Sequence, residues 1–220
     1  MNLFHISYGT VAHALLLCGL FGSIGAGNCL MRQGSESESR LTYFPMAKGS
    51  YWLYTSENDF EDTLVIRITD KFLSQKETLY AVEEMWPRIS LVRRYTLSYG
   101  NGSHNAIFRS PDHELPSDTT KILGTSGDQR SLWYDTSAKP GESWTVDYQS
   151  IPEWPTEQFI ITLASIADEV SVDEDVYERC IRFEFDHNGH VYAEWLSLGI
   201  GIVKRQYPEG VYLLRKYELR

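Results

Sequence analysis

The sequence predicts an all-β (mainly β) domain: a single curved antiparallel sheet, a sandwich or an open barrel, preceded by an N-terminal signal or anchor segment. Three observations predict this. Beyond residue 40, apolar and polar residues alternate with a period of two, which is typical of strands with one buried face. Asn-Gly and Pro-x-Gly sequences separate these runs as turns. The first charged residue is Arg32, so the first 31 residues differ chemically from all that follow.

The N-terminal segment is predicted to direct export. An apolar core over residues 11–21 precedes small residues over 22–27, as in a secretory signal peptide. This core is shorter than the roughly 20 apolar residues that a spanning helix needs. Residues 26–29 read Ala-Gly-Asn-Cys and resemble a bacterial lipoprotein signal, in which the cysteine is acylated and becomes the mature N-terminus. Cys29 is therefore the candidate lipid-attachment residue. Simple cleavage near Gly27 and an uncleaved anchor stay open as alternatives.

The chain is predicted to have three parts. Residues 1–28 form the signal peptide or membrane anchor, residues 29–40 a flexible Ser/Glu-rich tether, and residues 41–220 the β-rich domain. The formal net charge of −10 lies wholly beyond the leader, which argues against nucleic acid as a partner and against electrostatic docking on anionic lipid. Cys180 is the one cysteine of the β-rich domain, so no disulfide is expected within it.

The strands are predicted from runs rich in β-branched and aromatic residues that are bounded by turn residues. The clearest runs cover residues 63–69, 89–95, 158–163, 181–185 and 211–217. Hairpin turns are expected at Asn101-Gly102, at Asn188-Gly189 and over residues 208–210. The only helix expected is a short one near residues 126–132.

Two Gly-x-x-Trp sequences suggest that the domain holds two similar halves, at about residues 44–110 and 135–220. One runs from Gly49 to Trp52, and the other runs from Gly141 to Trp144. In both, glycine makes the turn and tryptophan closes the end of a sheet core.

The opening of the domain resembles that of a diffuse group of uncharacterised bacterial envelope lipoproteins and secreted β-rich proteins. The residues that carry the resemblance are an F-P-x-x-x-G-x-x-W-x-Y motif over residues 44–54 and a G-x-G-x-V-K motif over residues 199–204. The resemblance implies a β-rich exported domain. It implies no catalytic residue.

The aromatic side chains are a candidate binding surface. Six Trp and 14 Tyr could include a stacking platform for sugar rings or lipid tails, although core packing is the simpler expectation. Trp52, Trp144 and Trp195 are expected in the core. Trp86 and Trp154 neighbour prolines near strand ends, so they are the candidates for exposure.

Histidine and acidic clusters are weak candidates for metal sites, and we predict no metal. His187 and His190 bracket a turn, but a third ligand such as Asp186 or Glu184 is not required by any spacing. The acidic residues between 168 and 175 lack the central glycine of a calcium loop, so a solvated hairpin tip is expected there. The Asp-His-Glu sequence over residues 112–114 is expected to be a polar loop.

No sequence motif predicts catalysis. Cys180 has acidic neighbours that would raise its pKa, and no histidine can be placed beside it, so a structural thiol is expected. Gly199 and Gly201 lack the third glycine and the following helix of a phosphate loop, which leaves a tight bend between strands. A dispersed hydrolytic site is the least favoured of the functions considered.

The leading hypothesis is a non-enzymatic binding or assembly module of the cell envelope, without a cofactor. It would be exported and membrane-anchored, periplasmic or on the outer-membrane face, with the membrane and an envelope protein as partners. The alternative is a carrier that holds an apolar ligand such as a lipid in the concave face of the sheet. A deep apolar cavity would favour the carrier, and a filled core with an exposed aromatic patch would favour the binding module.

Overall fold

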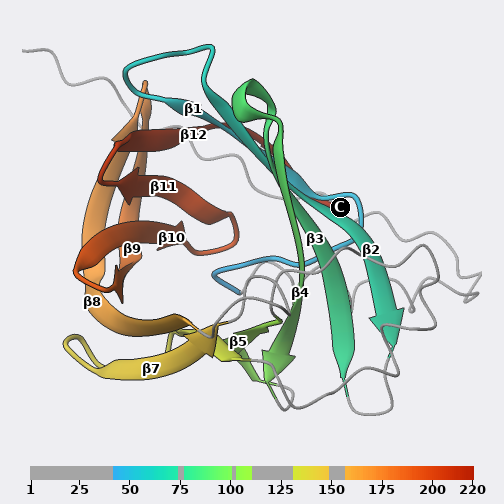
Figure 1. Cartoon of the computed structure of the whole chain (residues 1–220), viewed down its shortest axis with the longest axis vertical. Coiled ribbons are helices and arrows are strands. Elements are labelled where there is room, and N and C mark those ends of the chain that lie inside the picture. The colour runs from blue at the N-terminus through green and yellow to red at the C-terminus, as the bar shows by residue number, and fades with distance from the viewer. Residues whose placement is uncertain (1–41, 74–76, 101–102, 111–130, 149–156) are drawn as a thin grey trace, which may run out of the picture. The chain divides into compact units, whose positions relative to one another are not determined.

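The computed structural model describes residues 42–73, 77–100, 103–110, 131–148 and 157–220 (Figure 1). Almost all of these residues lie in strands, and a short 3-10 helix, η1 (Pro87–Ile89), is the one helix among them. The strands are β1 (Tyr51–Ser56), β2 (Thr63–Leu73), β3 (Thr78–Trp86), β4 (Leu91–Gly100), β5 (Ser103–Arg109), β6 (Ser131–Asp135), β7 (Ser143–Tyr148), β8 (Glu157–Val172), β9 (Asp175–His187), β10 (His190–Ser197), β11 (Gly201–Tyr207) and β12 (Gly210–Glu218). The predicted all-β class is confirmed.

All twelve strands belong to one antiparallel sheet, in the order β6-β5-β4-β3-β2-β1-β12-β11-β10-β9-β8-β7. Strands that follow one another in the chain are neighbours in the sheet, as short connections favour, except β6 and β7, which form its two edges. In addition, β1 pairs with β12, which lies far from it in the sequence. The sheet is therefore two consecutive six-strand meanders that meet at this pair.

The sheet curls until its two edge strands, β6 and β7, approach each other, which makes it nearly closed and barrel-like. Side chains bridge these edges: the indole N–H of Trp144 donates to the Leu132 carbonyl at 2.8 Å, and the Ser131 hydroxyl donates to the Asp147 carbonyl at 2.9 Å. Among the alternatives that the sequence left open, the structure has a single curved sheet.

The concave face holds the core, because alternate side chains of each strand point to it. Apolar residues from both meanders are fully buried there, including Leu64, Ile66, Ile161, Leu163, Phe183 and Phe185. Residues paired across neighbouring strands point to the same face of the sheet, so apolar residues lie opposite apolar residues. Trp52 lies opposite Ile66, and Phe185 lies opposite Ile161.

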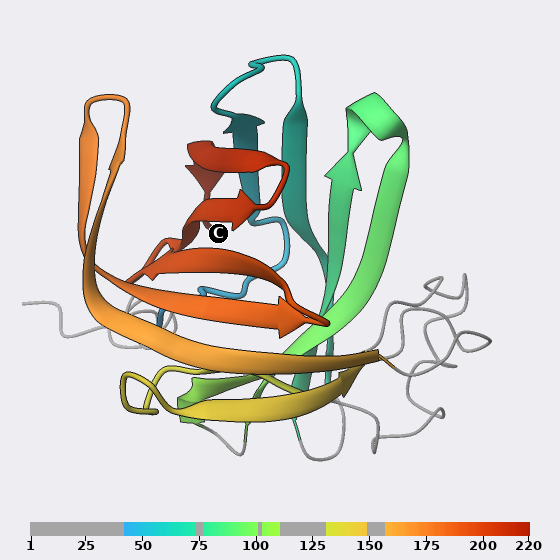
Figure 2. The ribbon, with the colours of Figure 1, turned by 60° about the vertical axis from the view of Figure 1, so that its left-hand side comes forward.

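The far end of the β8–β9 hairpin forms an arm, drawn in orange at the upper left of Figure 2. The β8–β9 register shifts three times between Leu163 and Val170, and such irregularities bend a strand pair. Asp173, at the turn of the arm, is ion-paired with Arg215 of β12. The arm therefore contacts the convex side of the sheet.

The predicted turns agree with the structure where they are described. Asn188 and Gly189 have φ angles of 54° and 83°, as the tight hairpin between β9 and β10 requires. Tyr207 pairs with Gly210 across the third predicted turn. Residues 101–102 lie outside the described residues, but Gly100 and Ser103 on either side are paired.

The expected helix near residues 126–132 is wrong where it can be compared. Leu132 lies in β6, because its segment pairs with β5 and supplies Trp133 and Tyr134 to the core. Residues 126–130 lie outside the described residues.

The two Gly-x-x-Trp turns have the same backbone hydrogen bonds. Gly49 N donates to Ile68 O at 2.8 Å, and Gly141 N donates to Leu163 O at 2.7 Å. Both glycines have φ near +90°, a conformation that favours glycine. The likeness of these turns is thus local and structural, while the domain and half boundaries stay predictions.

The burial of each described tryptophan is set by the face of the strand to which its side chain points. Trp52 and Trp195 are buried as expected, and Trp144 is half-buried. The expected exposure of Trp86 is wrong: the side chain is buried, because it is in phase with the inward residues Val82 and Glu84 and is covered by Arg93 at 5.1 Å. Trp154 lies outside the described residues.

Candidate functional site

Three charged side chains meet on the concave face of the sheet. Arg205 comes from β11, Glu84 from β3 and Glu194 from β10. Arg205 Nη1 donates to Glu84 Oε1, and Arg205 Nε lies 3.0 Å from Glu194 Oε1 as an ion pair. Each side chain is at most 4% exposed. We call these three residues the inner ion cluster.

Burial of these charges is offset by their pairing. Removing an ion from water costs several kcal/mol, which only close opposite charges and hydrogen bonds can offset. Burial raises the pKa of Glu84, but Arg205 and Arg109 outweigh burial and hold that pKa below its ordinary value. Burial also lowers the pKa of Arg205, and Glu194 and Glu84 overcome this and raise it well above its ordinary range. Glu84 and Arg205 therefore stay ionised at neutral pH.

Tyrosine hydroxyls surround the inner ion cluster. Tyr134 donates a hydrogen bond to Glu194 Oε2, and Tyr54 donates to the Ile202 carbonyl at 2.9 Å. Arg205 Nη1 donates to the Tyr207 hydroxyl at 3.4 Å. Burial raises the pKa of all three phenols, so they remain neutral. The concave face thus presents fixed, protonated hydroxyl groups beside fixed charges.

A second buried arginine, Arg109 of β5, lies between two aromatic rings. Its guanidinium carbon is 3.8 Å from the ring centre of Tyr95 and 4.7 Å from that of Trp133. Rings stacked on a guanidinium are a favourable cation–π arrangement. The Arg109 side chain also lines a small cavity.

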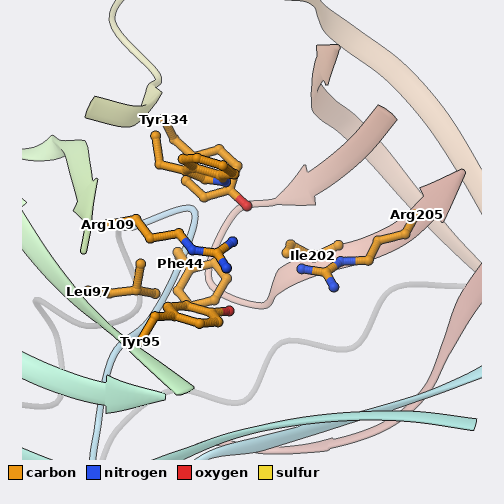
Figure 3. Close-up of a pocket in the computed structure, with 8 residues that line it drawn as sticks. Phe44, Tyr95, Leu97, Arg109, Tyr134, Ile202 and Arg205 are labelled. Carbon is orange, nitrogen blue, oxygen red and sulfur yellow. The ribbon is translucent and has the colours of Figure 1, made fainter. Parts of the chain in front are cut away.

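A small cavity separates the two arginines. Its water-accessible volume is about 10 Å³, near the minimum that holds one water-sized occupant. Figure 3 shows the Arg109 and Arg205 guanidinium groups on opposite sides of this space, with the Tyr95 and Tyr134 hydroxyls pointing into it. The lining residues are Phe44, Tyr95, Leu97, Arg109, Trp133, Tyr134, Ile202 and Arg205. The cavity is polar at its centre and apolar along its walls.

The candidate residues from the sequence lie elsewhere. His187 and His190 are register partners, as the turn required, and His187 stacks on Phe159 at 4.7 Å between ring centres. Within the described ranges, no group of three or more His, Cys, Asp or Glu side chains could hold a metal ion. Cys29 and residues 112–114 lie outside the described residues.

Cys180 is a buried thiol on the β8–β9 arm, and its Sγ donates to the Tyr177 carbonyl at 3.4 Å. Burial, with a smaller contribution from Asp168, raises the pKa of the thiol to about 11. The predicted direction of the pKa shift is therefore right, although burial rather than neighbouring charge is its main cause.

The acidic segment of the arm divides into two parts. Residues 173–175 are exposed at its tip, as expected. Asp168 corrects the expectation of a solvated tip, because it lies within β8, where it accepts a hydrogen bond from Trp195 Nε1 at 2.8 Å and lies 3.7 Å from Arg182.

The glycines of the predicted bend behave as expected. Gly199 and Gly201 have φ angles of 77° and 104°, next to a register shift between β10 and β11. A Cβ atom on Gly201 would lie 3.2 Å from Trp52 Nε1, so the close packing of that ring also favours glycine.

The sequence analysis missed the inner ion cluster and Arg109. A signal was present, because Glu84 falls in phase with Val82 and Trp86, so alternation alone places its carboxylate on the buried face. A charged residue at an inward position rarely stays buried without a partner. The identity of that partner could not be read from the strand alone.

Comparison with known proteins shows two remote structural similarities. No protein-family model and no curated protein matches the chain. A candidate exported protein with a YmcC-like fold from Bacteroides fragilis NCTC 9343 is 11% identical, with a TM-score of 0.46. A candidate lipoprotein from Parabacteroides distasonis ATCC 8503 is 9% identical, with a TM-score of 0.40. Each comparison covers 81% of this chain and 99% of the other. Function is therefore inferred from this chain's own residues.

Proposed function

We propose that the chain is an exported, envelope-anchored binding protein without enzymatic activity, whose curved sheet holds a small polar ligand on its concave face. The observation that carries this proposal is the cavity between Arg109 and Arg205, into which two tyrosine hydroxyls also point. A few converging polar groups set in apolar walls are the usual chemistry of a small-ligand site.

Export and anchoring are supported by the leader. The uncharged residues 1–31 carry the features of a signal, and Cys29 stands where a lipoprotein cysteine would. Residues 34–40 have no apolar side chain, which suits a tether between an anchor and a folded domain. In the described part of the chain, no helix has the length and apolar character to cross a membrane.

Binding is favoured over acid–base catalysis by the direction of the pKa shifts. A general acid or base works best when its pKa lies near the working pH. The pKa of Glu84 moves down, whereas those of Tyr134 and Arg205 move up and that of Cys180 rises to about 11. The pKa of each of these four groups is thus shifted away from neutral pH. Such groups serve as fixed charges and donors.

The alternative, a carrier of an apolar ligand, gains no support from this cavity. Pockets for ligands of drug size have volumes of roughly 300–1,000 Å³ and mostly apolar linings. The cavity here holds about 10 Å³ and faces two guanidinium groups. A small polar ligand fits its size and lining better than a lipid tail does.

Anchoring is tested by expressing the full chain with its own leader beside a Cys29→Ser variant. We expect the original chain to incorporate radiolabelled palmitate and to fractionate with membranes. Its intact mass should correspond to the loss of residues 1–28 and the addition of acyl groups. The Cys29→Ser variant should carry no label. An unmodified chain beginning at Met1 would contradict the anchoring proposal.

Binding is tested by thermal unfolding of the purified protein with a panel of small anions and neutral polar solutes. We expect at least one solute to raise the Tm of the original chain and of Arg94→Gln, which removes a convex-face charge, but not that of Arg109→Gln. Fluorescence of 1-N-phenylnaphthylamine tests the alternative in the same samples. Enhanced dye fluorescence without any stabilising polar solute would overturn the proposal in favour of the apolar carrier.

A further inference from the structure

We propose that the β8–β9 arm is a strap that opens and closes as a unit over the convex face of the sheet. In this structure the arm is closed, and it covers Trp195 of β10 and the thiol of Cys180. Opening would uncover both side chains without unfolding the barrel. This inference concerns the convex face and does not depend on the ligand proposed for the concave face.

The arm has a buried inner face and an outer face that is open to water. Val170 and Val172 are 4% and 3% exposed, and Cys180 is fully buried. Ser171 and Val176, which pair with each other across the hairpin, are both exposed. This alternation is the pattern of a strand pair that packs on a surface by one side. The surface beneath the inner face is the convex side of the sheet, where β8 contacts β12.

Two polar contacts attach the arm to the sheet. Near the root of the arm, Asp168 accepts a hydrogen bond from Trp195 Nε1 at 2.8 Å. At the tip, Asp173 is ion-paired with Arg215 of β12. The Asp173 side chain is 69% exposed, so water and salt weaken this tip contact as they do other exposed ion pairs. The tip is therefore held by a contact that breaks readily.

Arg215 is held in position to receive the tip of the arm. Its Nε donates to Thr55 Oγ1 at 2.7 Å, and its guanidinium carbon lies 5.3 Å from the ring centre of Phe60. The Arg215 side chain is only 16% exposed. Because these neighbours already order the guanidinium, little further ordering of this side chain is needed when Asp173 returns. The sheet is thus prepared for closure.

The root of the arm has the irregular backbone that a hinge needs. The β8–β9 register shifts twice between Leu163 and Asp168. On the facing strand, Arg179 has a φ angle of 55°, which is uncommon for a residue with a side chain. Such irregularities interrupt the ladder and let a strand pair bend. Rotation at this root moves the arm while its own pairing, from Val170 to the turn, stays intact.

The arm controls access to an aromatic and basic surface. Trp195 is 7% exposed while the arm is closed. Lys204 Nζ lies 4.5 Å from the centre of the Trp195 ring, and the two residues are register partners on the convex face. When the arm opens, the indole N–H loses its acceptor and becomes a hydrogen-bond donor beside this cation.

Opening is measured by alkylation of Cys180 with N-ethylmaleimide. The purified full chain is labelled, and the product is quantified at the Cys180 peptide by mass spectrometry. Because the closed arm buries the thiol, the labelling rate reports the fraction of molecules whose arm is open. We expect this rate to change little up to about 1 M urea, since lifting the arm exposes little surface. A rate that rises with urea as steeply as global unfolding does would overturn the proposal.

Two valines of the arm provide matched variants. Val172→Ala removes methyl groups from the inner face, so it should raise the labelling rate about tenfold. Val176→Ala makes the same change on the outer face and should alter the rate by at most about twofold. Asp173→Asn weakens the tip contact and should raise the rate about threefold. Equal labelling rates in Val172→Ala and the original chain would overturn the proposal.

The indole N–H of Trp195 distinguishes opening of the whole arm from fraying of its strands. Hydrogen exchange of this proton, followed by NMR, should give the same opening free energy as Cys180 labelling, and a smaller one than global unfolding in urea. The indole N–H of Trp52, which donates to the Ile200 carbonyl, should exchange more slowly. Labelling of Cys180 while the Trp195 proton stays protected would show fraying and overturn the proposal. Equal exchange at Trp52 and Trp195 would show global opening and overturn it as well.

Discussion

Glu83 and Glu84 are neighbours on β3, yet their carboxylates lie in opposite environments. Glu84 faces the concave side and pairs with Arg205, and both side chains are less than 5% exposed. Glu83 faces the convex side and pairs with Arg67 and with Arg94, whose Nε lies 2.8 Å from Glu83 Oε1. Those two arginine side chains are 50% and 39% exposed. One strand therefore carries two glutamates in ion pairs: Glu84 in a fully buried pair, and Glu83, 11% exposed, with two arginines that are open to water.

The difference teaches that the face of the strand, rather than the chemistry of the pair, decides its energetic effect. Exposed ion pairs contribute roughly 0–1 kcal/mol, because water and salt screen both charges. Breaking a buried pair by removing one partner costs about 3–5 kcal/mol, because the other charge remains buried and uncompensated. The two glutamates are thus a matched internal comparison.

Removing the inner arginine should have the largest effect. Arg205→Met leaves two buried carboxylates without their shared cation, so we expect the free energy of unfolding to fall by about 3–5 kcal/mol. Urea denaturation followed by tryptophan fluorescence measures this. Arg94→Met is the convex-face control and should change the free energy by at most about 1 kcal/mol. Similar losses in the two variants would contradict the conclusion that the buried pair contributes more to stability than the exposed one.

Replacing the inner glutamate should give a loss that depends on pH. Glu84→Gln removes a charged hydrogen-bond acceptor, so we expect about 1.5–3 kcal/mol of destabilisation at pH 7. The folded pKa of Glu84 is below its ordinary value of 4.5, so its contribution is present above pH 4.5 and is lost as the pH falls through the folded pKa. Unfolding free energies measured from pH 7 to pH 3 should therefore converge for the two proteins. A constant difference down to pH 3 would contradict this account.

A contact on the convex side should have an intermediate effect, because the β8–β9 arm covers it. Asp168→Ala leaves the indole N–H of Trp195, which is only 7% exposed, without its acceptor. We expect a loss of about 1–3 kcal/mol, the cost of an unsatisfied buried donor. Ser171→Ala, an exposed change on the same strand, is the control. If Asp168→Ala lowered the free energy of unfolding no more than this control, burial of the Trp195–Asp168 hydrogen bond under the arm would not affect stability.

Replacing the outer glutamate should have the smallest effect. Glu83→Gln weakens pairs with two exposed arginines, and we expect a loss of at most about 1 kcal/mol that shrinks further at high salt. Denaturation in 0.05 M and about 1 M sodium gluconate measures this, since a Debye length of roughly 3 Å at 1 M screens such pairs. A loss above 2 kcal/mol at both salt concentrations would show that Glu83 acts like its inner neighbour.

Much of the fold was predictable because it depends on local signals. Alternation identified the strands, and Asn188-Gly189 identified a turn whose two residues must both have positive φ. The burial of Cys180 was harder to predict, since it lies on a convex face that only the bent arm covers. The burial of Trp86 was not predicted, because Pro87 beside it indicated a strand end, whereas its strand phase places it inward.

The candidate site was not predictable because its partners are far apart in the chain. Arg205 and Glu84 are separated by 121 positions and meet only when the two meanders join. Alternation can place one charge on the buried face. It cannot state which distant strand supplies the counter-charge.

The pairing of β12 with β1 has a consequence for the order of events during synthesis. The first strand acquires its second neighbour only after Gly210–Glu218 has been made, so the sheet stays incomplete until then. Pairings this distant in sequence also form slowly, because a long loop must close first. A newly made chain of this topology therefore remains incompletely folded for a time, which is the state in which a protein can be threaded across a membrane.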